Sequence, residues 1–413
     1  MRRLLIIIGA LLLLVLIGIG GYFLFFTKDG GLVVDENPFG QAGDRDPGAL
    51  DPVIDTGVPT PGAGTLVAPR LLKISDRPVA LGTVSLYTPE KTTVVATSSI
   101  STSTPAQSVT TPEEVEVRYI DRQSGNVYAF KVHERVVTRL SNKTLPGITE
   151  AAWTRDGARA YVRFLEQDTS GSERVSTYIL PASGEGGFFL EQGLAQVISA
   201  SSSIITLLKS DSGSVASIRN ADGTNLRTLF SSVLSSLQVA PLGASYLAQT
   251  KATAHLDGYA FQVDGRGTFS RLLGPLRGLT TLPSPQGTSI LYSYVDRGRL
   301  YTQVFAVTGR TTVPLPLATL PEKCVWTVGG DAVYCAVPTA LSGLLPDEWY
   351  QGSRSFSDRI WRIDLASRVA TLVFDPRQLA DTAIDAQGLS LDTAEDVLVF
   401  MNRSDGSLWS YDL

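Results

Sequence analysis

The chain has 413 residues, of which 43% are apolar and only 18% are charged, so it can bury a large core. Its formal net charge of −5 and the lack of a basic cluster argue against a nucleic-acid-binding surface. It has no Gly-x-Ser-x-Gly motif and no glycine-rich phosphate-binding loop, which excludes an appended serine-hydrolase domain and a nucleotide-binding domain.

The first segment of the chain predicts a membrane anchor. Arg2 and Arg3 precede Leu4–Phe26, 23 residues without a charge, which can cross a hydrocarbon core of ~30 Å as a helix. The segment is longer than the apolar part of a cleaved signal peptide and lacks an Ala-x-Ala pattern, so we expect it to stay attached. The arginines place the N-terminus in the cytoplasm and the rest outside, in a single-pass protein of the cytoplasmic membrane. A cleaved export signal is the alternative, and it leaves the extracytoplasmic location unchanged.

Residues 27–68 predict an acidic linker. They are rich in Gly, Pro and Asp, carry seven acids against Lys28 and Arg45, and show no sustained apolar period. Because such a segment cannot bury enough apolar surface to offset the cost of ordering its backbone, we expect it to be disordered. The globular domain therefore begins at about residue 69 and runs to residue 413.

The globular part is organised around residues 279–309, which read LTTLP-SPQG-TSILYSYV-DRGR-LYTQVFAV-TG. Two turns separate three segments of alternating apolar residues, so this stretch predicts a meander of three antiparallel strands. One such sheet buries only part of its apolar surface, and it needs copies of itself on both sides.

The copies recur with the period of a propeller blade. Hairpins of the same kind begin at Ile148, Gln196, Leu237, Lys323 and Gly388. Their turns lie about 41–46 residues apart, except for one interval of about 64 residues that contains an extra segment of 21 residues, 338–358. A four-stranded blade has a period of about 40–45 residues.

With a further copy between Pro78 and Leu140, the repeats predict an all-β, seven-bladed β-propeller, with six or eight blades as alternatives. The last repeat has only three strands, whereas Pro69–Ser75 precedes the first blade without a partner. We therefore expect Pro69–Ser75 to complete the last blade, which closes the ring and removes exposed sheet edges. A stack of antiparallel sheets or two β-sandwiches is the alternative, but a sandwich does not predict the regular period.

The two cysteines, Cys324 and Cys335, lie in one predicted hairpin about a Gly329-Gly330 turn. Counting outward from that turn places them directly opposite each other, with Cα atoms about 4.5–5.5 Å apart, a separation that a disulfide can span. The predicted disulfide fits an oxidising compartment. Two buried free thiols are the alternative.

A Ser/Thr/Pro-rich tract, residues 88–112, interrupts the first blade and predicts a long solvated loop, with glycosylation as the alternative. His133 and His255 are the only histidines, and neither has metal ligands beside it, so we expect both in exposed turns. We expect no metal, no cofactor and no catalytic residue. Acids recur in hairpin turns, with a calcium role as the alternative reading: Asp156, Asp211, Asp222, Asp264, Asp296 and Asp405.

Residues 338–358, PTALSGLLPDEWYQGSRSFSD, form a loop between the second and third strands of the sixth blade. Such loops lie on the ring face that carries the connections between blades, where ligands commonly dock. Pro346 and the acids after it can start a short helix. Exposed aromatic residues beside charges are typical of a binding loop. The candidate binding residues are Leu344, Leu345, Asp347, Glu348, Trp349, Tyr350, Arg354 and Phe356. The alternative is that the aromatic side chains fold back and plug the ring.

The repeat that contains TRDGARAYV resembles the TolB-like and WD40-like propellers. The segments VRYIDRQSGNVYAF, KCVWTV…VYCAVP and DEWYQGSRSFSDRIWRIDL resemble uncharacterised membrane-anchored propellers of candidate-phylum bacteria, over most of residues 69–413. That group has no assigned activity, so the resemblance implies a propeller and carries over no catalytic residue. The chain lacks the separate N-terminal α/β domain of the TolB pattern.

These features predict a non-catalytic, membrane-anchored extracytoplasmic propeller for protein recognition or scaffolding at the cell envelope. We expect it to contact the membrane through residues 4–26 and to bind a protein or another envelope component on one propeller face. The alternative is an extracytoplasmic enzyme acting on glycans or peptides. Paired carboxylates about 5–10 Å apart in a cleft would favour a glycosidase.

Overall fold

The computed structural model describes residues 69–95, 107–167, 171, 173–200 and 202–413. The predicted anchor, residues 4–26, and the predicted linker, residues 27–68, lie outside these ranges. No helix within them is long and apolar enough to cross a membrane.

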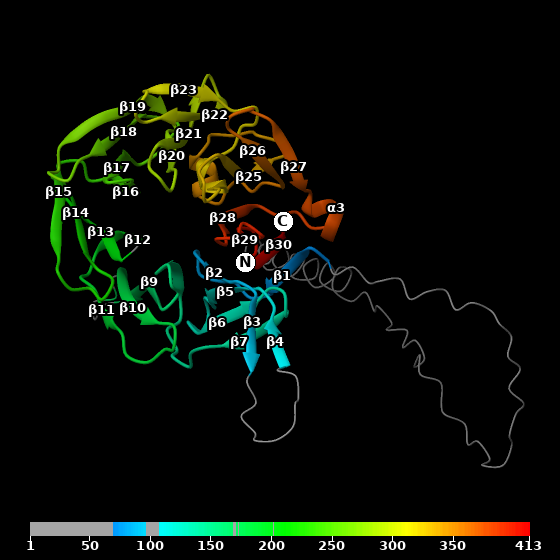
Figure 1. Ribbon diagram of the computed structural model, residues 1–413. Helices are drawn as coiled ribbons and strands as arrows, with labels where there is room; N and C mark the ends of the chain where they lie inside the picture. Colours follow the sequence, from blue (N-terminus) through cyan, green and yellow to red (C-terminus); the bar gives the residue numbers. More distant parts are fainter. Residues whose placement is uncertain (1–68, 96–106, 168–170, 172, 201) are drawn as a thin grey trace, which may run out of the picture. The chain divides into compact units, whose positions relative to one another are not determined.

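Seven four-stranded antiparallel sheets are arranged around a ring, as the period of the repeats predicts (Figure 1). In each blade the first strand of the repeat lies innermost, and successive strands pair outward. Blade 1 contains β2 (Val84–Thr88), β5 (Glu114–Ile120), β6 (Val127–Lys131) and β7 (Val136–Arg139). Blade 2 contains β8 (Ile148–Trp153), β9 (Arg159–Gln167), β10 (Glu173–Pro181) and β11 (Phe188–Phe189). Blade 3 contains β12 (Leu194–Ala200), β13 (Ser203–Ser210), β14 (Gly213–Asn220) and β15 (Arg227–Ser232). Blade 4 contains β16 (Leu237–Leu242), β17 (Ser245–Thr250), β18 (Asp257–Val263) and β19 (Phe269–Arg277).

The remaining blades follow the same order. Blade 5 contains β20 (Thr280–Pro283), β21 (Ser289–Asp296), β22 (Arg299–Ala306) and β23 (Thr311–Pro314). Blade 6 contains β24 (Cys324–Trp326), β25 (Ala332–Pro338), β26 (Asp358–Asp364) and β27 (Ala370–Phe374). Blade 7 contains β28 (Ala386–Leu391), β29 (Val397–Asn402), β30 (Leu408–Asp412) and the N-terminal strand β1 (Leu71–Ser75). Short helices connect some strands: η1 (Pro321–Lys323), α2 (Asp347–Tyr350) and α3 (Pro376–Ala380).

The ring closes through β1, which pairs antiparallel with β30 as the outermost strand of blade 7 (Figure 1). Leu71 lies opposite Tyr411, and Lys73 lies opposite Trp409. The predicted closure is therefore confirmed. Both ends of the propeller domain are held in one sheet, and β30 has no free edge along this pairing.

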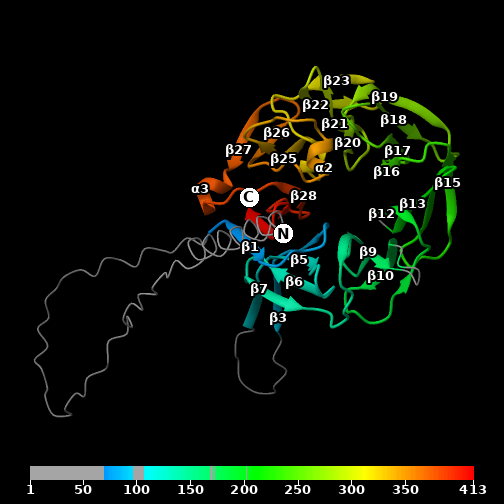
Figure 2. The same ribbon diagram turned by 180° about the vertical axis from the view of Figure 1, so that it is seen from behind.

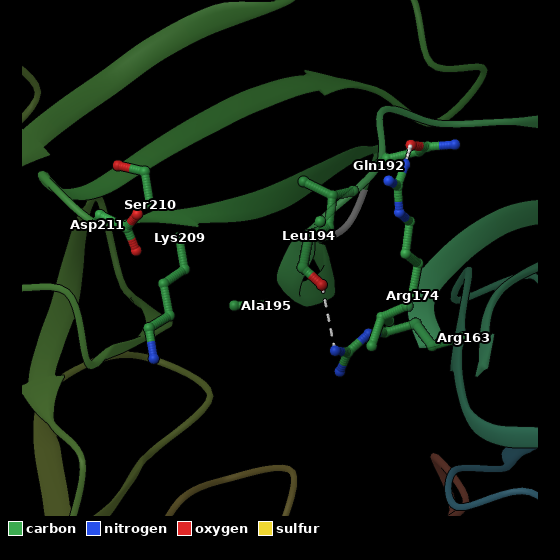
Figure 3. A pocket seen from close by; sticks show the side chains of 10 residues that line it. Arg163, Arg174, Gln192, Leu194, Ala195, Lys209, Ser210 and Asp211 are labelled. Carbon is green, nitrogen blue, oxygen red and sulfur yellow. Dashed lines mark hydrogen bonds between the residues drawn. The ribbon is translucent and has the colours of Figure 1, made fainter. Parts of the chain in front are cut away.

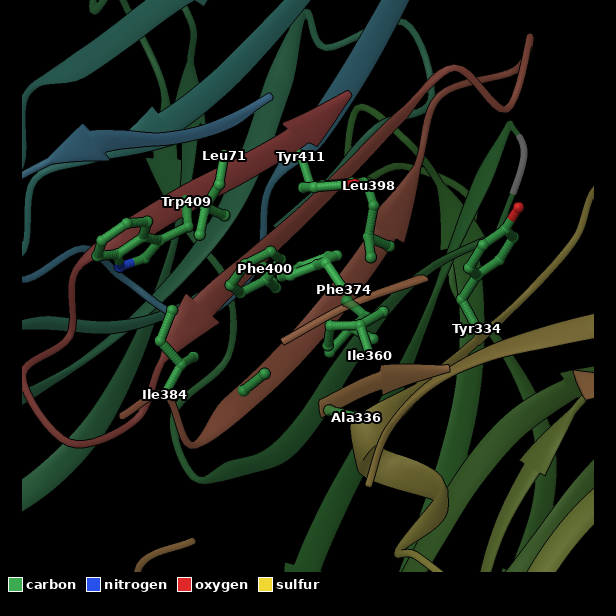
Figure 4. Packing of buried hydrophobic residues seen from close by; sticks show 12 residues of the cluster. Leu71, Tyr334, Ala336, Ile360, Phe374, Ile384, Leu398, Phe400, Trp409 and Tyr411 are labelled. Atoms are coloured by element: carbon green, nitrogen blue, oxygen red, sulfur yellow. The ribbon is translucent and has the colours of Figure 1, made fainter. Parts of the chain in front are cut away.

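The core consists of clusters between neighbouring blades. In Figure 4, residues from blades 6 and 7 interleave, with the Phe374 and Tyr411 rings stacked at 3.9 Å between centroids. Phe400 and Ile360 are completely buried in the same cluster. Because each blade buries its apolar faces only against its neighbours, the fold depends on the whole ring.

The hairpin of blade 6 has the predicted register. Cys324 lies opposite Cys335, their Cα atoms are 4.1 Å apart, and the structure joins them in a disulfide. The turn between them is closed by a hydrogen bond from the Gly330 N–H to the Thr327 carbonyl.

The Ser/Thr/Pro-rich tract differs from the prediction of a plain loop. Its two ends form a hairpin, β3 (Lys91–Val95) with β4 (Gln107–Thr111), that extends from blade 1. The physical reason is the density of Thr and Val, whose β-branched side chains favour extended backbone over solvated coil. Residues 96–106 lie outside the described ranges.

One face of the ring carries the loops between the second and third strands of the blades together with the connections between blades; we refer to it as the connection face. Hydrogen bonds join the two kinds of segment. The Gly278 N–H bonds to the Thr253 carbonyl, and the Arg403 N–H bonds to the Asp385 carbonyl. The candidate binding residues lie on this face, because they belong to the loop between β25 and β26.

Candidate functional site

The segment between β25 and β26, residues 339–357, contains the short helix α2, which begins at Asp347 directly after Pro346. Asp347 and Glu348 occupy its first turn, where acids complement the unpaired N–H groups of a helix start. The predicted helix start is confirmed. We refer to residues 339–357 as the insertion.

The aromatic residues of the insertion are not exposed, as a binding loop would require. Trp349 is only 3% exposed, and Leu345 and Phe356 are also buried, whereas Leu344 is 49% exposed. The three buried side chains form a cluster with Leu300 of blade 5 and Leu320 of the connection to blade 6, and Tyr350 packs against this cluster. The prediction of exposed aromatic anchors is therefore wrong for Trp349 and Phe356, and the candidate binding residue Leu345 is buried with them. The alternative, in which these side chains fold back onto the ring, is the arrangement found.

Polar contacts tie the insertion to other blades. The Asp347 carboxylate accepts a hydrogen bond of 2.6 Å from the Ala254 N–H of blade 4. The Arg403 guanidinium of blade 7 donates to the carbonyls of Trp349 and Tyr350 and lies 4.9 Å from the Trp349 ring centroid. The insertion thus contacts the connection-face segments of blades 4, 5, 6 and 7, and Figure 2 shows α2 between β20 and β25.

Beneath Trp349 lies a buried ion cluster. Lys323 is completely buried, and its Nζ lies 2.7 Å from Asp358 and 2.5 Å from Asp385, both also completely buried. The Trp349 indole N–H donates to both oxygens of Asp385 at 3.2 Å. Burial raises the pKa of Asp358 to about 6, although the Lys323 charge opposes that shift. One ammonium must neutralise two carboxylates, so one of them retains its proton more readily than usual.

Sequence reasoning did not identify this cluster. Lys323 ends η1 and Asp358 begins β26, and 35 positions separate them, so no local motif connects them. The sequence places a charged residue at the edge of an apolar run at Lys323 and again at Asp385. Many exposed strand ends have the same pattern, so it does not indicate burial. The two acids lie close together, but Trp349 covers them, and they do not form the open pair in a cleft that a glycosidase needs.

A further buried acid, Glu322, lies in η1 next to Lys323. The hydroxyl of Tyr350 donates a hydrogen bond to Glu322, and the other carboxyl oxygen of Glu322 is buried without a partner among the described residues. Burial raises the pKa of Glu322. Glu322 lines a cavity of about 180 Å³ with residues of the inner strands of blades 3 to 5, among them Gln196, Gln238 and Thr281.

Glu348 and Arg354 form an ion pair of 3.3 Å within the insertion, and both remain partly exposed. The eight candidate residues therefore divide into two groups. Leu344, Glu348 and Arg354 are at least partly open to solvent, whereas Leu345, Asp347, Trp349, Tyr350 and Phe356 hold the insertion on the ring.

The histidines and turn acids have local roles. His133 lies in the turn between β6 and β7, 3.5 Å from Glu114, and His255 lies in the loop between β17 and β18. Asp156 accepts hydrogen bonds from the Thr154 hydroxyl and from a backbone N–H of its own turn, and these bonds lower its pKa. Across the described ranges, no group of three or more His, Cys, Asp or Glu residues is placed to hold a metal ion.

A larger pocket, of about 520 Å³, lies on the connection face between blades 2 and 3. Figure 3 shows Arg163 and Arg174 on one side and Lys209, Ser210 and Asp211 on the other, with Leu194 between them. Sequence reasoning missed this pocket, because Arg163 and Arg174 belong to one hairpin of blade 2 and Lys209 belongs to blade 3, and only the packing of the two blades brings the three cations to one pocket.

Large apolar side chains are exposed on the connection face around this pocket and around the insertion. They comprise Leu165, Leu208, Val233, Leu234, Leu256, Leu341 and Leu344. Others lie in turns of the opposite face, at Leu226, Val328 and Val369, or on outer strands.

No protein-family model matches the chain, and no curated protein matches its sequence. Solved structures match the fold. An oligogalacturonate lyase from Vibrio parahaemolyticus is 8% identical, with a TM-score of 0.51, over 80% of this chain and 98% of that one. TolB from Acinetobacter baumannii is 11% identical, with a TM-score of 0.41, over 62% and 75%. The propeller domain of the Trilobed protease from Pyrococcus furiosus is 7% identical, with a TM-score of 0.48, over 72% and 90%. At such identities the likeness shows the fold alone: the chain contains a seven-bladed β-propeller.

Proposed function

We propose that this chain is a membrane-anchored, extracytoplasmic propeller that recognises a protein partner through its connection face. The observation that carries the proposal is the group of exposed apolar side chains on that face, which includes Leu256 in the loop of blade 4 and Leu344 on the insertion. Exposed apolar patches that are rimmed by polar residues typically mark protein-interaction surfaces.

The insertion supports the same proposal by its rigidity. Trp349 and Leu345 are buried, so the segment that presents Leu341 and Leu344 is fixed before any partner arrives. A fixed surface loses less conformational entropy on binding than a flexible loop. The aromatic residues then act as supports of the binding surface, and the partner contacts the residues that they leave exposed.

The proposed location rests on two features. The apolar segment Leu4–Phe26 has the length of a membrane span, and two arginines precede it. The disulfide between Cys324 and Cys335 fits an oxidising compartment.

Site-directed photo-crosslinking in cells tests the proposal. A crosslinking residue at Leu256 or Leu344 should yield discrete adducts with a partner protein, because both side chains lie on the proposed surface. The matched control positions are Leu226 and Val328, which are exposed on the opposite face. Leu256→Glu combined with Leu344→Glu should reduce crosslinking from a third position, Leu341, by at least about tenfold, because charges are costly in an apolar interface. Equal crosslinking from both faces would contradict the proposal.

A glycan- or peptide-acting enzyme is the second candidate function, and the observation that favours it is Glu322. Its raised pKa and its place in a cavity lined by amide side chains are properties of a general acid. Catalysis centred there would be abolished by Glu322→Gln, whereas the face variants above would leave it unchanged.

A further inference from the structure

The cavity of about 180 Å³ that Glu322 lines lies at the connection-face end of the inner strands of blades 3 to 5. Gln196, Gln238 and Thr281 line it, and each is the second or third residue of an innermost strand. These strands begin where the connections between blades end, so their first residues lie toward the connection face. The cavity therefore belongs to the face through which the chain is proposed to recognise a protein.

Glu322 gives this cavity a negative charge that the described residues do not neutralise. Of the residues that line it, only Glu322 is charged. The neighbouring Lys323 is committed elsewhere, because its Nζ lies 2.7 Å from Asp358 and 2.5 Å from Asp385. One carboxyl oxygen of Glu322 accepts the bond from the Tyr350 hydroxyl, and the other has no partner in the described structure. The carboxyl thus lacks a cation.

Three glutamine side chains line the cavity, and hydrogen bonds hold them in place. The Gln196 amide oxygen accepts a bond of 2.8 Å from the Val239 N–H, and the Gln238 amide oxygen accepts one of 2.6 Å from the Gln249 amide nitrogen. The Thr281 hydroxyl donates to the Gln249 amide oxygen. Because an amide oxygen has two lone pairs, each of these oxygens keeps one for a further donor. The cavity therefore presents neutral acceptors in fixed positions beside one carboxyl group.

This lining discriminates between charged groups. It disfavours an anion, because no cation lines the cavity. A divalent metal ion takes about six to eight oxygen ligands, usually with several carboxylates, whereas this lining has one. A guanidinium prefers two parallel carboxylate oxygens, and Tyr350 already occupies one of those of Glu322. An ammonium is a compact charge with three donors, which the carboxylate and the amide oxygens match.

Apolar side chains complete the lining. They are Val239, Ala240 and Leu247, of which Val239 and Leu247 are buried. An alkyl chain that ends in an ammonium packs its methylene groups along such a surface while its charge reaches polar groups. The cavity is smaller than the ~300–1,000 Å³ of sites that take drug-sized molecules, so it fits the end of a chain.

We infer that this cavity binds a primary ammonium group at the end of an alkyl chain, with its charge beside Glu322 and its N–H donors on the glutamine oxygens. The inference rests on the proposed recognition of a protein by the connection face, because a lysine side chain of the partner carries this group. A free alkylamine carries the same group. Burial raises the pKa of Glu322, and an ammonium beside it favours the charged carboxylate.

Isothermal titration calorimetry of the full-length protein with N-acetyl-lysine methylamide tests the inference. At about pH 7.5 the side-chain amine is protonated, and saturable binding is expected. The same compound with an acetylated side-chain amine lacks the charge and should bind at least about tenfold more weakly. Glu322→Gln keeps an acceptor for Tyr350 and should weaken binding of the lysine compound by at least about tenfold. The matched control is Glu150→Gln, near the start of the inner strand of blade 2 and outside the cavity, which should bind as the unaltered protein does.

Three results would overturn the inference. Equal binding of the two lysine compounds would remove the role of the charge. Unchanged binding by Glu322→Gln would place the site elsewhere, and tighter binding of N-acetyl-arginine methylamide would make the cavity a guanidinium site. A circular dichroism spectrum and a melting curve of each variant separate lost binding from lost folding.

Crosslinking in cells distinguishes the two sources of the ammonium group. If the partner supplies a lysine, Glu322→Gln should reduce crosslinking from Leu344 by at least about threefold, because a buried contact is lost. If the natural ligand is a free amine, crosslinking stays unchanged and butylamine binds as tightly as the lysine compound. Crosslinking from Leu256 and Leu344 without binding of any amine would exclude the ammonium site and leave protein recognition standing. Amine binding with equal crosslinking from both faces would do the reverse.

Discussion

At the residue scale, the buried cluster of Lys323, Asp358 and Asp385 shows how the insertion is held. Two carboxylates surround one ammonium. The centroid of the Trp349 ring lies 5.1 Å from the Lys323 Nζ, and the indole N–H donates a hydrogen bond to Asp385. Removing water from charges is costly, so such a cluster is retained only when nearly every lone pair has a partner. One oxygen of Asp358 has none in the described structure, and this is the position where a proton can reside.

The raised pKa of Asp358 gives a pH dependence that can be measured. Its pKa changes from an ordinary value of 3.8 to about 6 in the folded protein. Below about pH 4 the group is protonated in both states, and between about pH 4 and 6 the unfolded chain releases the proton first. The free energy of unfolding that Asp358 contributes should therefore fall as pH rises through this window, by on the order of 2–3 kcal/mol, and stay constant above it.

Urea unfolding of the protein and of Asp358→Asn at intervals from pH 4 to 7 checks this expectation. Lys323 and Asp385 face the group in both proteins, so the two profiles differ chiefly in the carboxyl of residue 358. The variant should lack the decrease between pH 4 and 6. Parallel profiles for the two proteins would show that Asp358 titrates normally.

At the scale of single elements, the strand β1 closes the ring. It places Leu71 and Ile74 in two different clusters, one between blades 6 and 7 and one between blades 7 and 1. Burying two such side chains contributes about 3–6 kcal/mol. A chain that starts at Val79 should melt about 6–12 °C below one that starts at Gly64, because 1 kcal/mol corresponds to roughly 2 °C in a domain of this size. Equal melting temperatures in differential scanning calorimetry would mean that β1 adds nothing to closure.

Elements with a strict local pattern were predictable from the sequence, and elements fixed by distant packing were not. The register of Cys324 and Cys335 followed from the position of one turn, and the blades followed from their period. The insertion breaks the period, so the sequence did not decide whether its aromatic side chains are exposed or fold back onto the ring. Burial of Trp349 depends on Leu300, Leu320 and Asp385, which no local rule connects to it.

The pocket between blades 2 and 3 was unpredictable for a related reason. Arg163 and Arg174 alternate with apolar residues and read as solvent-facing positions of ordinary strands. Only the crossing from β11 to β12 and the shortness of β11 bring them to an open cleft beside Lys209. Sequence reasoning therefore did not identify the residues that line this pocket.

At the scale of the whole molecule, the insertion joins four of the seven blades. It contacts Ala254 in blade 4, Leu300 in blade 5, Lys323 beside blade 6 and Arg403 in blade 7. Within the described ranges, the apolar cluster around its buried residues includes no residue of blades 1 to 3. Loss of the insertion should thus weaken one side of the ring and leave the other side intact.

Replacing Ser342–Arg354 by a short Gly-Ser bridge tests this asymmetry. Removing Trp349 and Leu345 exposes the Lys323 cluster to water and leaves a cavity, so we expect the melting temperature to fall by about 5 °C or more. Amide hydrogen exchange should increase in the connection-face segments of blades 4 to 7 and remain unchanged in blades 1 to 3. Trp349→Ala should reproduce the pattern in weaker form, whereas the matched variant Leu344→Ala, at an exposed position of the same segment, should not. Uniform exchange changes around the ring would mean that the blades respond as one unit and that the insertion has no special place in holding them.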